Sequence, residues 1–322
     1  MENKYTREYL LGTGVGLQDV DHLKTSEYFN KESQRYISGE ISLEEFGKLI
    51  KEYYKKKRDI NEDELEADNV SIKIGELIQD DSFTFTVGQF LSIHHYLFEG
   101  VFKRAGQMRT YNISKKEWVL EDDSVVYGDY RELEETLQYD FSVEKQFNYS
   151  KLSIDQTIER LAIFTANLWQ IHVFPEGNTR TVAVFLIKYL RSLGFDVSND
   201  LFRKNAWYFR NALVRANYTN IPKGIYEDRS FLVKFLRNLL LGETNVLENK
   251  LLHISLVKNR KKMSRDEKVV DLMKADPKIK TGEIATELGV SLRTAKSIIA
   301  SLGAKGIIER VNGKKYGFWK IK

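Results

Sequence analysis

The residues best suited to chemistry lie together in the stretch IHVFPEGNTR, residues 171–180. His172 has a side chain whose ordinary pKa is close to neutrality, so it can accept a proton from an attacking hydroxyl group. Glu176 supplies hard carboxylate oxygens, which suit Mg²⁺ shared between phosphate groups. Arg180 can bind phosphate oxygens through two parallel hydrogen bonds. The set predicts phosphoryl or nucleotidyl transfer, with His172 as the catalytic base and Glu176 as the metal ligand.

This stretch is expected to be the loop that joins two helices. Apolar residues recur at helical spacing from Ser153 to Gln170 and again from Thr179 to Leu193. The first N–H groups of a helix lack partners within the helix and carry a partial positive charge, so Gly177, Asn178 and Thr179 should form an anion site. A lone histidine or glutamate at a helix end is usually structural, and the conjunction of all these residues is what favours a site.

The remaining sequence predicts a mostly helical body around this loop. Ser42 is a candidate cap for a helix that ends in a run of basic residues, within a small helical module before about residue 60. Further helices are predicted by apolar spacing within 61–98, near 205–217 and near 229–241. Between Tyr111 and Tyr127, β-prone residues flank the turn-forming stretch 121–124, so a β-hairpin is expected there.

The C-terminal part has a different pattern, which predicts a winged helix-turn-helix. A helix at 266–275 precedes the stretch TGEIATELGVSLRTAKSIIASLG, and an Asn312-Gly313 turn then separates two short strands. From Lys258 to the end there are 17 Lys and Arg against 7 Asp and Glu, although the whole chain has a net charge of only +4. The second helix would enter the major groove of DNA, which makes this partner a reasonable expectation. The DNA-binding candidates are Arg293, Thr294, Lys296, Lys314 and Lys315. The alternative is a winged helix that contacts only proteins.

Composition excludes several classes of function. The 322 residues contain no cysteine, so disulfides, thiolate metal sites and cysteine nucleophiles are excluded. The sequence has no apolar run long enough for a membrane helix and no signal-peptide pattern at its start. We therefore expect a cytoplasmic protein with no membrane partner.

The loop HVFPEGNTR resembles the signature of the Fic family (Fic/Doc fold), whose pattern is His-x-Phe-x-Asp/Glu-Gly-Asn-x-Arg. The stretches YLFEGVFKRAGQMRTYNI (96–113) and WYFRNALVRANY (207–218) resemble flanking parts of the same family, so the resemblance covers about residues 61–240. It implies an all-α Fic-type helical core with a β-hairpin flap, followed by the α+β winged-helix domain. The expected divisions are an N-terminal helical module at 1–60, a Fic domain at 61–250 and the winged helix-turn-helix at 256–322.

The resemblance also implies an activity, the transfer of AMP from ATP to a Ser, Thr or Tyr hydroxyl of a target protein or of the chain itself. It implies that His172 is the general base and that Glu176 holds Mg²⁺. Phosphates would be bound by residues 177–180, which are Gly177, Asn178, Thr179 and Arg180. Tyr208 and Asn211 would lie on the adenine side of the site. The flap, which includes Tyr111, Asn112 and Ile113, would dock the target.

The sequence departs from the family pattern in ways that leave alternatives open. Ala183 stands where the commonest signature has a second arginine, and Thr179 replaces the usual glycine. The family's inhibitory pattern, Ser/Thr-x-x-x-Glu-Gly/Asn, fits residues 244–249 and makes Glu248 a regulatory candidate. One alternative is a Fic enzyme that uses another nucleotide donor. A second alternative is a DNA-binding transcriptional regulator whose Fic-like domain senses a nucleotide or a partner without turnover.

Overall fold

Many helices of the protein begin at a residue whose side chain accepts a hydrogen bond from the first turn. In the computed structural model, which describes residues 5–256, 264–311 and 317–322, Ser42, Ser153 and Ser264 each cap a helix. The backbone N–H of each of these serines also donates to the side chain of the Glu or Gln three residues later, which completes a capping box. The helix start predicted at Ser42 is therefore confirmed, and hydrogen bonds within the first turn of the helix account for it.

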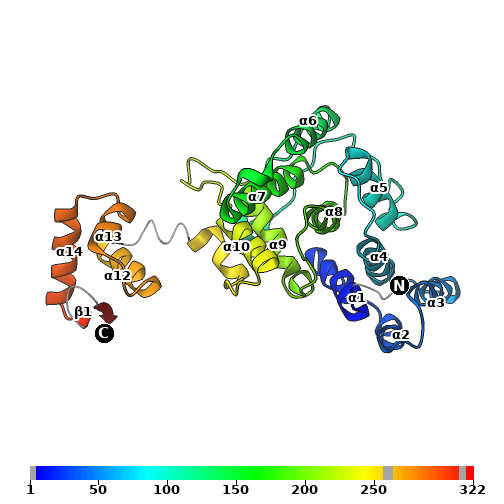
Figure 1. Ribbon diagram of the computed structural model, residues 1–322, viewed down its shortest axis with the longest axis horizontal. Helices are drawn as coiled ribbons and strands as arrows, with labels where there is room; N and C mark the ends of the chain where they lie inside the picture. Colours follow the sequence, from blue (N-terminus) through cyan, green and yellow to red (C-terminus); the bar gives the residue numbers. More distant parts are fainter. Residues whose placement is uncertain (1–4, 257–263, 312–316) are drawn as a thin grey trace. The chain divides into compact units, whose positions relative to one another are not determined.

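The described chain divides into two units, Met1–His253 and Ile254–Lys322. Each is considered separately below (Figure 1). The α-helices of the first unit are α1 (Arg7–Gly16), α2 (Glu27–Ser38), α3 (Leu43–Lys56), α4 (Glu62–Gln79), α5 (Val87–Phe98), α6 (Leu133–Lys145), α7 (Ile154–Ile171), α8 (Asn178–Ser192), α9 (Leu201–Ala216) and α10 (Ser230–Leu241). Its 3₁₀ turns are η1 (Leu17–Asp21), η2 (Trp118–Leu120), η3 (Tyr149–Lys151) and η4 (Asn249–Leu252).

Helix α8 is the centre of the first unit. Every residue from Asn178 to Leu190 is buried, and the helix contacts α4, α5, α7 and η1 (Figure 1). A helix that is covered on all sides has no solvent-facing stripe, so its charged residues must find partners within the protein. The loop that enters α8 is therefore fixed from several directions at once.

The residues before position 60 lie in the same compact unit as the helices that follow them. Helix α1 packs against α4 and α9, and Figure 1 shows it between them and α2. The contact with α4 is close because Gly14 has no side chain, and a Cβ added there would lie 2.1 Å from the carbonyl oxygen of Ser71. Through η1, the N-terminal segment thus forms part of the wall around α8.

The β-hairpin expected between Tyr111 and Tyr127 is not formed. This segment contains η2 and irregular backbone, and the only strands in the described residues lie near the C-terminus. Its apolar residues Val119, Leu120 and Val125 are buried instead of alternating between two faces. Packing against the helical body, rather than pairing of strands, has set the conformation here.

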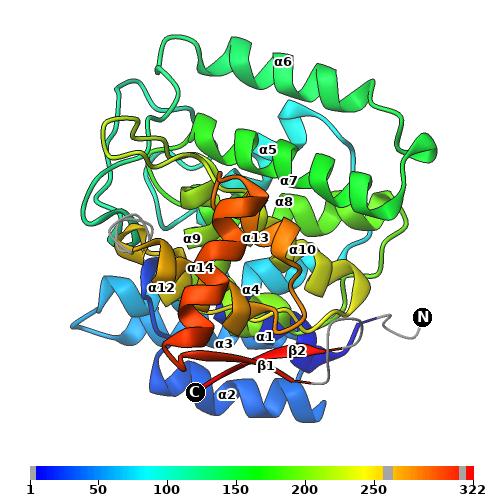
Figure 2. The same cartoon turned by 90° about the vertical axis from the view of Figure 1, so that its left-hand side faces the viewer.

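The second unit is a small α+β domain, as expected. It consists of α12 (Arg265–Ala275), α13 (Thr281–Glu287), α14 (Leu292–Ala304), β1 (Ile308–Val311) and β2 (Phe318–Ile321). The two strands pair antiparallel, with Ile308 opposite Ile321, and Figure 2 shows them at the C-terminal end of α14. A separate apolar core includes Val269, Ile284 and Leu302. The predicted Asn312-Gly313 turn, with Lys314 and Lys315, lies outside the described residues.

Within the described ranges, none of the helices combines the length and the apolar character that crossing a membrane requires.

Candidate active site

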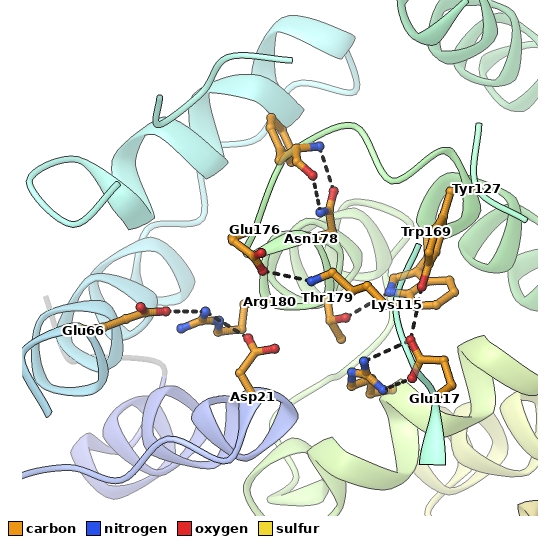
Figure 3. A network of polar contacts seen from close by, with 12 residues as sticks. Asp21, Glu66, Lys115, Glu117, Tyr127, Trp169, Glu176, Asn178, Thr179 and Arg180 are labelled. Carbon is orange, nitrogen blue, oxygen red and sulfur yellow. Dashed lines mark hydrogen bonds and ion pairs between the residues drawn. The ribbon is translucent and has the colours of Figure 1, made fainter. Parts of the chain in front are cut away.

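The loop between α7 and α8 is held by its own side chains. The backbone N–H of Phe174 donates to Oδ1 of Asn178 at 2.9 Å, and Nδ2 of Asn178 donates back to the carbonyl of Phe174 at 2.7 Å. The indole N–H of Trp169 donates to the hydroxyl of Thr179 at 2.9 Å (Figure 3). Asn178 and Thr179, expected to bind phosphate through the loop, therefore use their side chains to shape it.

Gly177 is required by the geometry at the start of α8. Its φ of +74° lies in the left-handed region, and a Cβ at this position would come within 2.4 Å of the ring of Phe98. Both conditions exclude a side chain. The close approach of Phe98 places the end of α5 directly against the entrance of α8.

His94, on α5, contacts the loop between α7 and α8 and holds it in place. The N–H of Gly106 donates to Nδ1 of His94 at 2.8 Å, so the ring proton lies on Nε2, which is 3.0 Å from the carbonyl oxygen of Glu176. The imidazole also stacks on Phe174 at 3.7 Å between ring centroids. Burial lowers the pKa of His94 to about 4, so this ring is neutral near pH 7 and acts as a structural brace.

His172 ends α7 in a left-handed conformation, with φ of 52° and ψ of 57°. Its side chain is buried, 4% exposed, between the rings of Tyr127 and Trp169, and neither ring nitrogen has a hydrogen-bond partner. Burial, followed by the charge of Lys115, holds the pKa of His172 well below its usual range. The imidazole is therefore neutral and unengaged, which is the state that a proton acceptor needs.

The segment 111–128, called here the cover, lies over His172, and a single buried guanidinium ties both of its ends to the loop. Arg109 donates to the carbonyls of Ile171 and His172, at 3.3 and 2.8 Å, and to those of Tyr111 and Gly128 in the cover. Because no carboxylate shares these contacts, the charge of Arg109 is spread over main-chain oxygens. The position of the cover and the turn at His172 are thus set by the same side chain.

The interior of the cover is anchored to α9. The carboxylate of Glu117 is fully buried and pairs with Arg210 through both nitrogens of its fork, at 2.5 and 3.1 Å. The hydroxyl of Tyr127 donates to the same carboxylate at 3.1 Å (Figure 3). This buried pair explains why the segment folds onto the helices instead of forming a flap of two strands.

Glu176 faces the cover and is paired with it. Nζ of Lys115 lies 2.9 Å from Oε2 of Glu176, whose side chain is 58% exposed (Figure 3). The described residues contain no cluster of three or more His, Cys, Asp or Glu that could hold a metal ion. Glu176 alone therefore fits Mg²⁺ only as one ligand among oxygens supplied by a bound phosphate, after Lys115 has moved.

Arg180 does not point to an open anion site. Its Nη2 lies 2.5 Å from Glu66 on α4 and 2.9 Å from Asp21 in η1 (Figure 3). Its Nη1 donates to Gln18 at 2.8 Å. The guanidinium is 2% exposed and lies over the ring of Phe98. The side chains of Arg180, Glu66 and Asp21 together carry a net negative charge, which repels a phosphate. The expected phosphate contact of Arg180 is therefore blocked in this conformation.

A cavity of about 560 Å³ opens beside this ion pair. Asp21, the partner of Arg180, and His22 form one wall, Trp207 and Arg210 of α9 a second, and the cover from Lys116 to Trp118 a third. The rings of His22 and Trp207 are 4.3 Å apart. Neither His172 nor residues 177–180 line this cavity, so it adjoins the loop without opening onto it.

Tyr208 and Asn211 do not line this cavity, and their assignment to the adenine side stays a prediction. Tyr208 is 1% exposed and donates to the carbonyl of Phe231, and Asn211 is fully buried and donates to Asn249. The apolar spacing of α9 predicted the helix but not which polar residues would be buried.

Glu248 is also not where the sequence pattern suggested. It precedes η4 in an extended conformation and pairs with Lys250 at 2.7 Å, so it neither lies on an α-helix nor contacts α8. The carboxylates that do hold the signature arginine are Glu66 and Asp21. They have no local sequence signal, because they lie 114 and 159 positions from Arg180.

The predicted flap residues lie at the start of the cover. The carbonyl of Tyr111 accepts from Arg109 at 2.6 Å, its ring is half exposed, and Oδ1 of Asn112 accepts from the N–H of Tyr130 at 2.9 Å. Ile113 is partly buried. These residues present no free strand edge of the kind that would dock a target by added pairing.

In the second unit, α14 has the expected polar side. Arg293 and Lys296 are exposed, Thr294 is partly buried with its hydroxyl 2.9 Å from that of Ser291, and Ala295 faces the core. The N-terminal half of α14 therefore presents two cations to solvent.

Two stretches of the chain match models of known protein families. A model of the Fic/DOC family matches residues 84–190, and a model of the winged helix-turn-helix DNA-binding domain matches residues 264–309. No curated protein matches the chain. Among solved structures, a Fic family protein from Desulfovibrio desulfuricans G20 is similar, with 12% identity, a TM-score of 0.45, and coverage of 98% of this chain and 87% of that one. The N-terminal FIC domain of the Bep8 protein, a VirB-translocated effector from Bartonella sp. 1-1C, is similar with 16% identity, a TM-score of 0.44, and coverage of 60% and 93%. The chain thus contains a Fic/DOC family domain around α8, followed by a winged helix-turn-helix domain of the DNA-binding type.

Proposed function

We propose that the protein is a DNA-binding Fic-type nucleotidyltransferase, which transfers AMP from ATP to a hydroxyl group of a target protein or of the chain itself. The observation that carries this proposal is the state of His172. A buried imidazole normally has a hydrogen-bond partner, and one without any partner calls for an explanation such as a catalytic role. His172 has none at either nitrogen, and it lies six residues before Asn178, the first residue of α8, whose N-terminus has no side-chain cap.

In this proposal His172 is the general base. Its neutral ring accepts the proton of the target hydroxyl while that oxygen attacks the α-phosphorus of ATP, and pyrophosphate leaves. The N–H groups at the start of α8 stabilise the charge that develops on the phosphate oxygens. Mg²⁺, with Glu176 as its protein ligand, would neutralise charge on the donor phosphates.

The flat base of the donor would occupy the cavity beside η1 and the cover. Trp118 and Trp207 offer aromatic faces there, and Arg210 lies over the ring of Trp207 at 5.2 Å. Aromatic and guanidinium planes bind a base by stacking, with little dependence on which base it is. This cavity is therefore the proposed base site, and ATP is the donor proposed first.

The described conformation is a closed one. Arg180 is held by Glu66 and Asp21, and Lys115 is paired with Glu176. Binding of the donor must therefore move the cover and release at least one of these ion pairs. Because these ion pairs must break before the donor binds, we expect the proposed transferase activity to be low in the absence of an activator.

The test is incubation of the full chain with α-labelled ATP and Mg²⁺, alone and with a cell extract as a source of targets. Labelled protein is expected with the parent and not with His172→Ala. Label that persists in His172→Ala would remove the proposed base. Intact mass after incubation with each nucleoside triphosphate identifies the donor, because the mass added to the protein differs between AMP and UMP.

The second candidate function is a DNA-binding regulator that senses a nucleotide or a partner without turnover. It is favoured by the ion pairs of Arg180, together with Ala183 in place of a second arginine, because both reduce the positive charge available to a triphosphate. This candidate predicts that ATP changes DNA affinity while no label or added mass appears under any condition.

A further inference from the structure

The start of α8 has no cationic side chain that is available to bind the phosphates of a nucleotide. Position 183, one turn beyond Arg180, is a fully buried alanine. Arg180 itself is surrounded by Glu66, Asp21 and Gln18. A nucleotide triphosphate carries several negative charges, and such ligands are held in proteins by cationic side chains as well as by helix N-termini. Another element must therefore supply this charge.

Lys115 is the side chain in the right place to do so. It comes from the cover, reaches Glu176 at 2.9 Å, and lies close enough to His172 for its charge to act on the imidazole. Glu176 directly precedes the first residues of α8, so the ammonium group stands at the edge of the proposed anion site. Its side chain is 27% exposed, and its Nζ makes one contact, an exposed ion pair of a kind worth at most about 1 kcal/mol.

We propose that Lys115 is the phosphate-binding cation of this centre and that it exchanges Glu176 for the donor phosphate when the cover opens. In the closed form its pair with Glu176 fastens the stretch of the cover between Tyr111 and Glu117 to the loop that follows His172. In the open form the ammonium group of Lys115 binds the donor phosphate, and the carboxylate of Glu176 becomes available to the metal ion. Because Arg109 holds Tyr111 and Arg210 holds Glu117, only the short stretch around Lys115 between them has to move. This inference rests on the proposed nucleotide-binding function.

Calorimetric titration of the full chain with ATP and Mg²⁺ at low salt tests the phosphate contact. Lys115→Met should weaken binding at least about tenfold, and Lys115→Arg, which keeps the charge, should bind within about threefold of the parent. Lys103→Met is the matched control, because Lys103 is an exposed lysine close in sequence and outside the cover. Parent-like affinity in Lys115→Met would overturn the inference while leaving the proposed function intact. Absence of ATP binding by the parent would instead remove the proposed donor and this inference together.

The fastening role has a readout that does not depend on activity. Diethyl pyrocarbonate modifies accessible neutral imidazoles, and peptide mapping with fragment-ion sequencing locates the modification among the chain's five histidines, including the adjacent His94 and His95. Without nucleotide, His172 should react several times faster in Lys115→Met and in Glu176→Gln than in the parent. His94, which is 1% exposed and lies outside the cover, should keep its slow rate and so report that the fold is intact. Equal rates at His172 in all three proteins would show that the pair does not fasten the cover.

Discussion

The guanidinium of Arg109 donates from Nε to the carbonyl oxygen of His172 at 2.8 Å, and this contact joins the two segments on which the proposed chemistry depends. One segment is the left-handed turn that orients the imidazole, and the other is the cover above it. The orientation of His172 is therefore not a property of the α7–α8 loop alone.

Replacing Arg109 should loosen both segments. In Arg109→Lys at most three N–H donors remain for four carbonyls, and the planar fork is lost, so the free energy of unfolding should fall by about 3 kcal/mol. Urea unfolding measures this loss. Arg104→Lys, five residues earlier and exposed, is the control and should change stability by less than about 0.5 kcal/mol. Equal stability of the two variants would show that the buried contacts of Arg109 contribute little.

Neutralising Glu66 should activate the centre. In Glu66→Gln the side chain can still accept a hydrogen bond from Arg180, but one of the two opposing charges is gone. We expect label transfer from ATP to rise about tenfold, which corresponds to about 1.4 kcal/mol. Glu62→Gln on the exposed start of α4 is the control. Unchanged transfer in Glu66→Gln would mean that this ion pair does not restrain the reaction.

The first unit should lose stability as the pH falls from 6.5 toward 4. The unfolded chain binds a proton at His94 below about pH 6.5, whereas the folded form does so only below its pKa of about 4. The loss between pH 7.5 and 5 is therefore about 2 kcal/mol from this residue, and the lowered pKa of His172 acts in the same direction. Urea unfolding at the two pH values should show a smaller difference for His94→Asn than for the parent.

A side chain at position 177 should not be tolerated. Gly177→Ala would combine a left-handed φ with a Cβ placed 2.4 Å from the ring of Phe98, and the expected cost is at least about 2 kcal/mol. Gly88→Ala, at the start of α5, is the matched control because a Cβ there meets its nearest atom at 3.9 Å. Thermal unfolding of both variants measures the difference. Similar midpoints would indicate that Phe98 can move aside without cost.

Binding of DNA by the winged helix-turn-helix should depend on α14. Removing one phosphate contact lowers the slope of log affinity against log salt by about one unit, so Lys296→Gln in the full chain should show this change. Fluorescence anisotropy with a labelled duplex across a salt series is the measurement. Lys274→Gln, an exposed lysine on α12, should leave the slope unchanged. If the intact protein binds no duplex at low salt, the domain is used for another contact.

Local patterns in the sequence were sufficient for most helices. Ser42 and Ser153 are followed by apolar residues at helical spacing, and the same short-range hydrogen bonds that make them good caps are present in the structure. The C-terminal domain was also predicted, because the spacing of its apolar residues and its turn residues is local information. Boundaries differ by a few residues, as at α9, which begins at Leu201.

Long-range pairing was not predictable. The charged residue Arg180 inside an apolar helix could have indicated that buried acids surround it, but nothing in the sequence identifies Glu66 or Asp21 as those acids. The β-prone residues of the cover likewise predicted strands, because the sequence does not show that Glu117 is buried against Arg210. In both cases the partners come from helices far away along the chain.

Asp21 belongs at the same time to the wall of the 560 Å³ cavity and to the partners of Arg180. Whatever occupies that space and draws this carboxylate toward itself must weaken its hold on the arginine. By thermodynamic reciprocity, an anion that captures the arginine must to the same degree favour occupation of the space. Two weakly binding fragments of one ligand, supplied separately, should therefore assist each other's binding even though they share no covalent link.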